Sequence, residues 1–89
     1  MTSRTTAQFR ALLANLPIQV QRQAADAYQL FRSNPHHPSL RFKSVNTRQP
    51  MYSVPIGIRH RALGVYRNDV IIWFWIGTHA EYEELLSRS

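Results

Sequence analysis

Two short stretches of this sequence carry side chains that could act on a phosphate. Arg59, His60 and Arg61 are consecutive, and His79 follows the apolar run at residues 70–76. Metal-independent RNA cleavage needs a base for the 2′-hydroxyl proton, positive charge at the scissile phosphate and an acid for the leaving 5′-oxygen. These four residues are therefore the best local candidates for the chemistry, with the arginines as the positive charge and His79 as a proton-transfer group. A solvated arginine pair and a surface histidine beside a helix cap are the competing interpretations.

The local pattern suggests how these side chains are held. Strand alternation would place Arg59 and Arg61 on one side and His60 on the other. Thr78-His79-Ala80-Glu81 matches a capping box, which puts His79 at the first helical position, where the helix dipole favours a neutral imidazole. Tyr82, one turn later on the same helix face, could stack on a base or simply pack on the sheet.

Other basic and metal-binding patterns are weaker. Arg41 and Lys43 share a strand face and could contact phosphate, although a solvated face is the alternative. His36 and His37 are adjacent, so they point apart, and no Asp, Glu or Cys is near them in sequence. We therefore expect no metal site and no cofactor. The chain has no cysteine and therefore no disulfide, so a reducing cytoplasm is the simplest expected location.

Charge narrows the choice of partners. The net charge is +6, and lysine contributes only Lys43 to the basic residues. Residues 1–80 hold ten basic and two acidic side chains (+8), whereas residues 81–89 hold three acidic and one basic (−2). Arginine at this excess favours bidentate contact with phosphate or carboxylate. A nucleic acid or an acidic protein is the expected partner, unless the charge serves only solubility.

The apolar spacing predicts the order of the elements. Helical patterns cover residues 6–15, capped by Thr5, and a second segment starting at Pro17; a last helix starts at His79. Extended segments cover residues 40–45, 52–58, 61–66 and 70–77, joined by short turns. This order predicts one α+β domain over residues 1–89. An N-terminal helical hairpin would pack on a four-stranded antiparallel sheet, with a C-terminal helix.

Residues 70–76 are apolar on both faces of their predicted strand. By alternation, one face consists of Val70, Ile72, Phe74 and Ile76, and the other of Ile71, Trp73 and Trp75. We expect the helices to pack on the first face. Trp73 and Trp75 would then form an exposed apolar patch for a partner. Packing of the two indoles against the last helix, through Leu85 and Leu86, is the alternative.

Four blocks, read in order, resemble one known family. NPHHPSLRFKSV, YSVPIG, HRALGVYRND and VIIWFWIGTHAEYEELL resemble the RelE/ParE superfamily of type II toxin-antitoxin toxins, and together they cover nearly the whole chain. The resemblance implies a small cytoplasmic toxin with a curved antiparallel sheet, neutralised by a cognate antitoxin protein. RelE-like members cut mRNA in the ribosomal A site, whereas ParE-like members inhibit DNA gyrase.

The resemblance implies inhibition of translation by ribosome-dependent mRNA cleavage, with the ribosome and mRNA as partners. A ParE-like gyrase inhibitor and a degenerate toxin that keeps only antitoxin binding and autoregulation are the alternatives. The family's YRALG block reads HRALG at residues 60–64 of this chain, and Arg61 matches its phosphate-binding arginine. The resemblance therefore makes Arg61, together with His79, a candidate catalytic residue. Ser53 and Pro55, however, stand where RelE-like enzymes carry lysines, and His60 replaces the usual tyrosine. The RNA or phosphate contacts would then be Arg59, Arg41, Lys43 and Tyr82.

Overall fold

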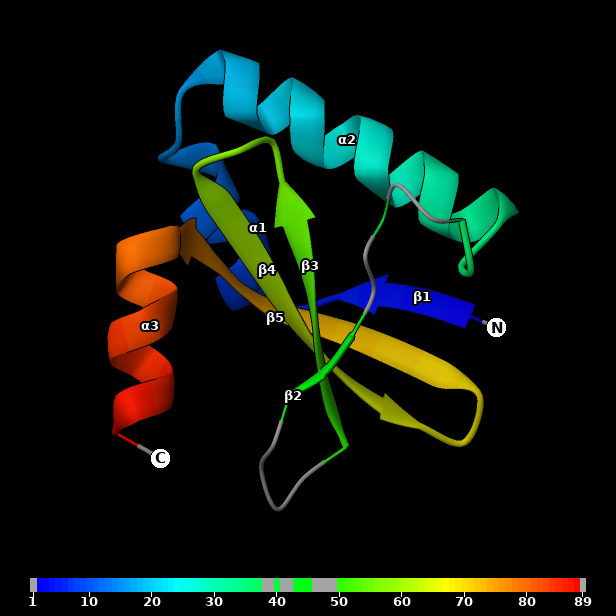
Figure 1. Cartoon of the computed structure of the whole chain (residues 1–89). Coiled ribbons are helices and arrows are strands. Elements are labelled where there is room, and N and C mark those ends of the chain that lie inside the picture. Colours follow the sequence, from blue (N-terminus) through cyan, green and yellow to red (C-terminus); the bar gives the residue numbers. More distant parts are fainter. Residues whose placement is uncertain (1, 38–39, 41–42, 46–49, 89) are drawn as a thin grey trace.

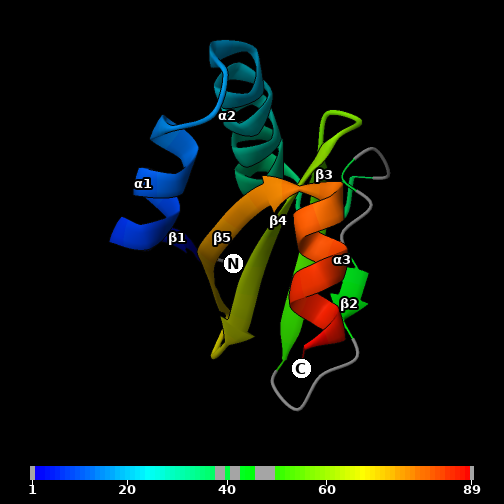
Figure 2. The ribbon, with the colours of Figure 1, turned by 90° about the vertical axis from the view of Figure 1, so that its left-hand side faces the viewer.

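The computed structural model describes residues 2–37, 40, 43–45 and 50–88. Within them the elements follow in the order β1 (Thr2–Thr5), α1 (Ala7–Ala14), α2 (Ile18–Ser33), β2 (Lys43–Val45), β3 (Met51–Ile56), β4 (His60–Arg67), β5 (Val70–Thr78) and α3 (His79–Ser87). Figures 1 and 2 show α1 and α2 on one face of the sheet and α3 on the other. The predicted α+β arrangement, with a helical hairpin and a C-terminal helix, is confirmed.

The sheet has one strand more than predicted. In the described chain its order is β1-β5-β4-β3-β2; β1 runs parallel to β5 and the other pairs are antiparallel. The β1 sequence TSRT has no apolar alternation, so nothing local marks it as a strand. Backbone pairing with β5 defines it instead, beginning with the Thr2 N–H, which donates to the Asp69 carbonyl at 2.9 Å.

The helix starts follow from side-chain caps. Thr6 caps α1, its Oγ1 accepting from the Phe9 N–H at 3.0 Å; the predicted Thr5 cap is wrong by one residue because Thr5 belongs to β1. The capping box of α3 is confirmed. Thr78 Oγ1 accepts from the Glu81 N–H at 3.1 Å, and Glu81 Oε1 accepts from the Thr78 N–H at 2.8 Å.

A β-bulge changes the faces of β5. Leu63 pairs with Trp75 and the next residue, Gly64, pairs with Trp73, so Phe74 is an extra residue between them. Trp73 therefore faces α1 and α2, while Phe74 and Trp75 both pack on the α3 side. The prediction that Val70, Ile72, Phe74 and Ile76 face the helical hairpin is therefore wrong except for Ile76. Val70 and Ile72 lie on the face opposite to Ile71 and Trp73, and Ile72 is exposed.

The described residues form two apolar clusters. The main core lies between the helical hairpin and the sheet and includes Phe9, Phe31, Ile71, Trp73 and Ile76. A smaller cluster lies under α3, where Val45, Leu63 and Tyr82 are buried and Met51, Phe74, Trp75 and Leu86 pack against them.

The two tryptophans therefore differ in environment. The predicted exposed patch is wrong for Trp73, which is only 4% exposed. Trp75 is half-buried in the α3 cluster with Leu86, as expected from the alternative in which the indoles pack against the last helix.

Candidate functional site

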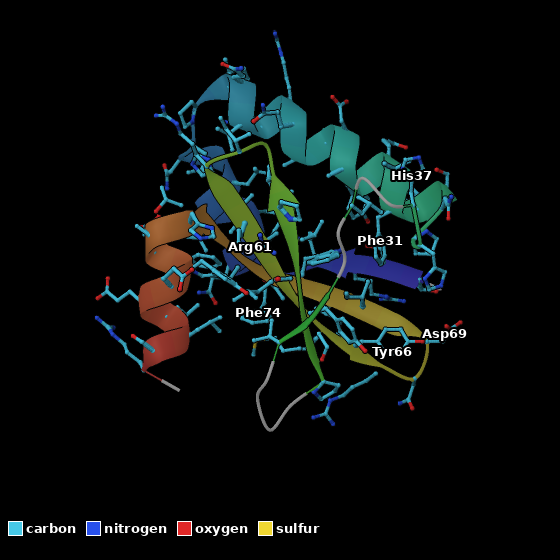
Figure 3. All side chains as sticks on the ribbon, viewed as in Figure 1. Phe31, His37, Arg61, Tyr66, Asp69 and Phe74 are labelled. Carbon is cyan, nitrogen blue, oxygen red and sulfur yellow. The ribbon has the colours of Figure 1, made fainter. Side chains whose placement is uncertain are left out.

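A cluster on the α3 side of the sheet joins three elements through one buried hydroxyl. Arg61 Nη2, from β4, donates to Ser53 Oγ of β3 at 2.9 Å. The Tyr82 hydroxyl, from α3, donates to the same Oγ at 3.3 Å. Ser53 is fully buried, so these two bonds satisfy acceptor positions that water cannot reach. Figure 3 shows Arg61 on the side of the sheet that α3 covers.

The strand register explains why these residues meet. In β3 and β4, Arg61 pairs with Pro55 and Leu63 with Ser53. Alternation then turns Ser53, Arg61 and Leu63 toward α3, and turns Val54 and Ala62 toward the main core. Because α3 begins directly after β5, its Tyr82 falls over this part of the sheet.

Arg61 lies against an aromatic ring and keeps an unused donor. Its guanidinium carbon is 5.0 Å from the centre of the Tyr82 ring, within the range of a cation–π contact. Its Nε is buried and has no hydrogen-bond partner in the described part of the chain. A buried donor without a partner costs roughly 1–3 kcal/mol. Because Nε is buried, an incoming phosphate or carboxylate oxygen would have to contact the other guanidinium nitrogens.

His79 lies at the exposed end of the same cluster. Its ring centre is 5.9 Å from that of Tyr82, with the ring planes tilted by 38°. His79 Nε2 lies 3.0 Å from Glu83 Oε1, and because a carboxylate only accepts, Nε2 carries the hydrogen. Nδ1 is thus the nitrogen left to exchange a proton. Arg61, Tyr82 and His79 form a row from a half-buried cation to an exposed imidazole, which we call the Arg61 row.

A second carboxylate beside the row is held in its ionised form. The Thr78 backbone N–H, which donates to Glu81 Oε1, lowers the pKa of Glu81 the most; the Thr78 side chain and the nearby His60 lower it further. Glu81 is therefore fixed by the cap of α3 as an acceptor.

Of the other predicted contacts, Arg59 is described by the structure and does not join the row. Arg59 is exposed in the turn before β4, which starts at His60, so the expectation that it shares a strand side with Arg61 is wrong. Only its backbone takes part, because its carbonyl accepts from the His79 N–H at 2.7 Å. Arg41 lies outside the described residues. Lys43 begins β2 opposite Ser53, but its side chain is likewise outside the described part.

Among the described residues no group of three or more His, Cys, Asp or Glu side chains is placed to hold a metal ion. No helix in this part of the chain is long and apolar enough to cross a membrane.

Comparison with known proteins decides the family. Residues 18–84 match the model of the ParE-like toxin domain family. The chain belongs to this family. No curated protein matches the sequence significantly.

Solved structures show that the ParE-like domain shares its fold with several toxins. Similar structures include the toxin–antitoxin complex RelB–RelE from Methanococcus jannaschii (TM-score 0.74, 15% identity, covering 91% of this chain and 95% of the other). YafQ from E. coli gives a TM-score of 0.68 at 10% identity, covering 90% and 94%. The YoeB/ParE toxin from Agrobacterium tumefaciens gives 0.68 at 10% identity, covering 89% and 99%. At these identities the likeness concerns the fold.

Ser53 is the site residue of the ParE-like domain whose role the sequence did not reveal. The only signal is a small polar residue at a strand position that alternation assigns to a covered face. Strand patterns predict which face such a residue takes, but not that a hydroxyl there receives donors from two other elements.

We expect Ser53→Ala to destabilise the ParE-like domain. The change removes the acceptor of both Arg61 Nη2 and the Tyr82 hydroxyl, leaving two donors without this partner. The free energy of unfolding, measured by urea denaturation, should fall by about 1–3 kcal/mol. Ser44→Ala, on an exposed position of β2, is the matched control and should change it by less than about 0.5 kcal/mol. Equal losses in the two variants would contradict the role assigned to Ser53.

Proposed function

We propose that this chain is the toxin of a toxin–antitoxin pair and inhibits translation by cutting mRNA on the ribosome. The observation that carries the proposal is the Arg61 row. It places a cation, an aromatic ring and an exposed proton-transfer group side by side on the α3 side of the sheet. Phosphodiester cleavage without a metal requires positive charge and two proton transfers, and the row offers the charge and a group for one of the transfers.

Each member of the row has a part in the reaction. The 2′-oxygen of the RNA attacks the phosphorus, its proton leaves to a base, and the bond to the 5′-oxygen breaks as that oxygen gains a proton. The products are a 2′,3′-cyclic phosphate and a free 5′-hydroxyl. Arg61 offsets the negative charge that develops on the phosphate oxygens. His79 Nδ1 performs one proton transfer, with solvent available for the other, and Tyr82 offers its ring to a base.

The proposed protein partner is a cognate antitoxin. Two of the similar structures are complexes of RelE with RelB, from Methanococcus jannaschii and Pyrococcus horikoshii. A net charge of +6 favours an acidic partner. With Trp73 buried in the main core, Trp75 is the tryptophan left for a contact of this kind.

A gyrase inhibitor is the second candidate function, and one observation favours it. The strand positions where RelE-like nucleases carry lysines hold Ser53, whose hydroxyl accepts from Arg61 and Tyr82, and Pro55, which has no basic group. A protein that only binds its target needs no base at these positions.

Two parallel assays test the proposal. The purified chain is added to a cell-free translation reaction, whose mRNA is mapped by primer extension, and to a gyrase supercoiling reaction. We expect the mRNA to be cut in register with its codons, only when ribosomes are present, and we expect no effect on supercoiling.

His79→Ala should lower the cleavage rate by about 10²–10⁴, the usual contribution of a positioned proton-transfer group. His36→Ala, at an exposed position after α2, should leave the rate unchanged.

The other outcomes each reject the nuclease. An intact message together with blocked supercoiling would establish the gyrase inhibitor instead. If neither assay responds, the chain is a degenerate toxin whose activity is limited to antitoxin binding and autoregulation.

A further inference from the structure

A cavity of about 330 Å³ lies between the helical hairpin and the sheet. Phe9 and Leu13 of α1, Ala24 and Phe31 of α2, and Trp73 of β5 contribute to its wall. We call it the hairpin cavity. Val54 and Ala62 also line it, and these residues face away from Ser53 and Arg61 in the strand alternation. The hairpin cavity therefore lies on the opposite face of the sheet from the Arg61 row. Figure 2 shows α1 and α2 over that face.

The cavity exists because α2 presents small side chains to it. Ala24, Ala25 and Ala27 all line the space, where larger residues would have reached the sheet. Apolar walls without atoms opposite them lose dispersion contacts, and an empty apolar space lowers stability in proportion to its volume. An apolar molecule of suitable size would restore these contacts. The volume lies at the lower end of the range of small-molecule pockets, about 300–1,000 Å³.

One cation lies at the wall of the hairpin cavity, and the other polar groups are engaged. Arg10 Nη1 donates to the Thr5 carbonyl at 2.9 Å and to Thr5 Oγ1 at 3.0 Å, which holds the exposed guanidinium in place. The Gln21 amide donates to the Leu16 carbonyl at 2.9 Å, and the Tyr28 hydroxyl donates to the Ser3 carbonyl at 3.1 Å. Among the described lining residues there is no Asp or Glu.

We propose that the hairpin cavity binds a small amphipathic carboxylate. The apolar tail lies among Phe9, Ala24, Phe31 and Trp73, and the carboxylate is bound by the guanidinium of Arg10. A guanidinium with donors beyond Nη1 matches a carboxylate in geometry and charge. A bulkier charged ligand such as a nucleotide would not fit the apolar walls. This binding site is separate from the proposed nuclease activity, and neither depends on the other.

Fluorescence of Trp73 tests the proposal directly, because this indole lines the cavity. In a Trp75→Phe background Trp73 is the only tryptophan. Decanoate, added below its micelle concentration, should change the Trp73 emission in a saturable, one-to-one manner and raise the thermal midpoint of unfolding. Absence of saturable binding would overturn the proposal.

Two pairs of variants locate the ligand. Ala27→Leu fills the cavity and should abolish the decanoate response, whereas Ala80→Leu, exposed on α3, should retain it. Circular dichroism checks the fold of each variant. If Ala27→Leu fails to fold, Ala25→Leu at the exposed side of the same wall replaces it. Decanoate binding that survives both fillings would show that the ligand lies elsewhere, and the proposal would be wrong.

The charge is tested with Arg10→Gln. This variant should bind decanoate about tenfold more weakly or worse, as expected for loss of a charged hydrogen bond. Its affinity for decanol, which has the same tail without the charge, should not change. Arg22→Gln, exposed on α2 and absent from the described lining, is the control and should bind decanoate like the unaltered chain. Equal weakening in the two arginine variants would refute the role of Arg10.

Discussion

Replacing Trp73 with alanine should remove about 3–5 kcal/mol from the free energy of unfolding, as large-to-small changes at buried aromatic residues do. Trp73 is 4% exposed, and its ring meets Phe31 edge-on with the ring centres 5.4 Å apart. Its indole Nε1 donates to Ser3 Oγ of β1 at 3.1 Å, so the same residue ties the first strand to the core. Domains of this size have only about 5–15 kcal/mol of stability in total. Urea denaturation followed by circular dichroism measures the loss.

Two further variants separate the contributions of Trp73. Trp73→Phe keeps an aromatic ring but loses the bond to Ser3, so it should lie between the unaltered chain and the alanine variant. Ile72→Ala, next in the chain and 40% exposed, is the control and should cost less than about 1 kcal/mol. If Ile72→Ala proved as costly as Trp73→Ala, the face assignment of β5 would be wrong.

The bulge in β5 shows what a single strand's sequence leaves undetermined. The apolar run at residues 70–76 correctly indicated a covered strand, but alternation beyond Trp73 failed because Phe74 is an extra residue. The cause lies on the neighbouring strand. A Cβ added at Gly64 would be 2.8 Å from Cε3 of Trp73, so the glycine leaves room for the indole. A pattern read within residues 70–76 contains no information about Gly64.

Local signals were sufficient at the start of α3, where the structure depends on neighbours in sequence. The capping box from Thr78 to Glu81 was predicted from its spacing and is present. In contrast, β1 forms by pairing Thr2–Thr5 with residues near the other end of the chain, and its own side chains carry no strand pattern. Pairings across so long a separation depend on the whole fold, which a local window cannot represent.

In the candidate site, too, some features follow from local sequence and others arise only in the assembled fold. Arg61 was named from its residue type and the resemblance of its block, and His79 and Tyr82 from residue type and helix spacing. The structure brings the three into one row. The role of Ser53 arises only when β3, β4 and α3 are assembled, because its hydroxyl accepts from the other two elements. Arg59 failed for a local reason: it lies in the turn, so strand alternation does not apply to it.

Arg61→Ala should lower the rate of ribosome-dependent mRNA cleavage by about 10²–10³, the range found when one donor to a developing oxyanion is removed. The reason is that Arg61 is the member of the row with a permanent positive charge, held by Ser53 and by the Tyr82 ring. Arg61→Lys should recover only part of the rate. A lysine keeps the charge but lacks the planar fork that can stack on Tyr82 while donating to Ser53 and a phosphate. Single-turnover primer extension at saturating protein measures the rate of cutting.

Arg67→Ala is the matched control, because Arg67 ends the same strand and is exposed. It removes the same charge from the net +6 without touching the row, so it should leave the single-turnover rate nearly unchanged. If both variants lost the same activity, general attraction of RNA to a basic protein would explain the effect, and Arg61 would have no special contact with the phosphate.

The free energy of unfolding of Arg61→Ala gives a second criterion. Arg61→Ala also removes the buried Nε that has no partner among the described residues, which offsets part of the lost packing on Tyr82. A large fall in cleavage with a small change in urea stability is therefore the result that separates a phosphate contact from a structural one.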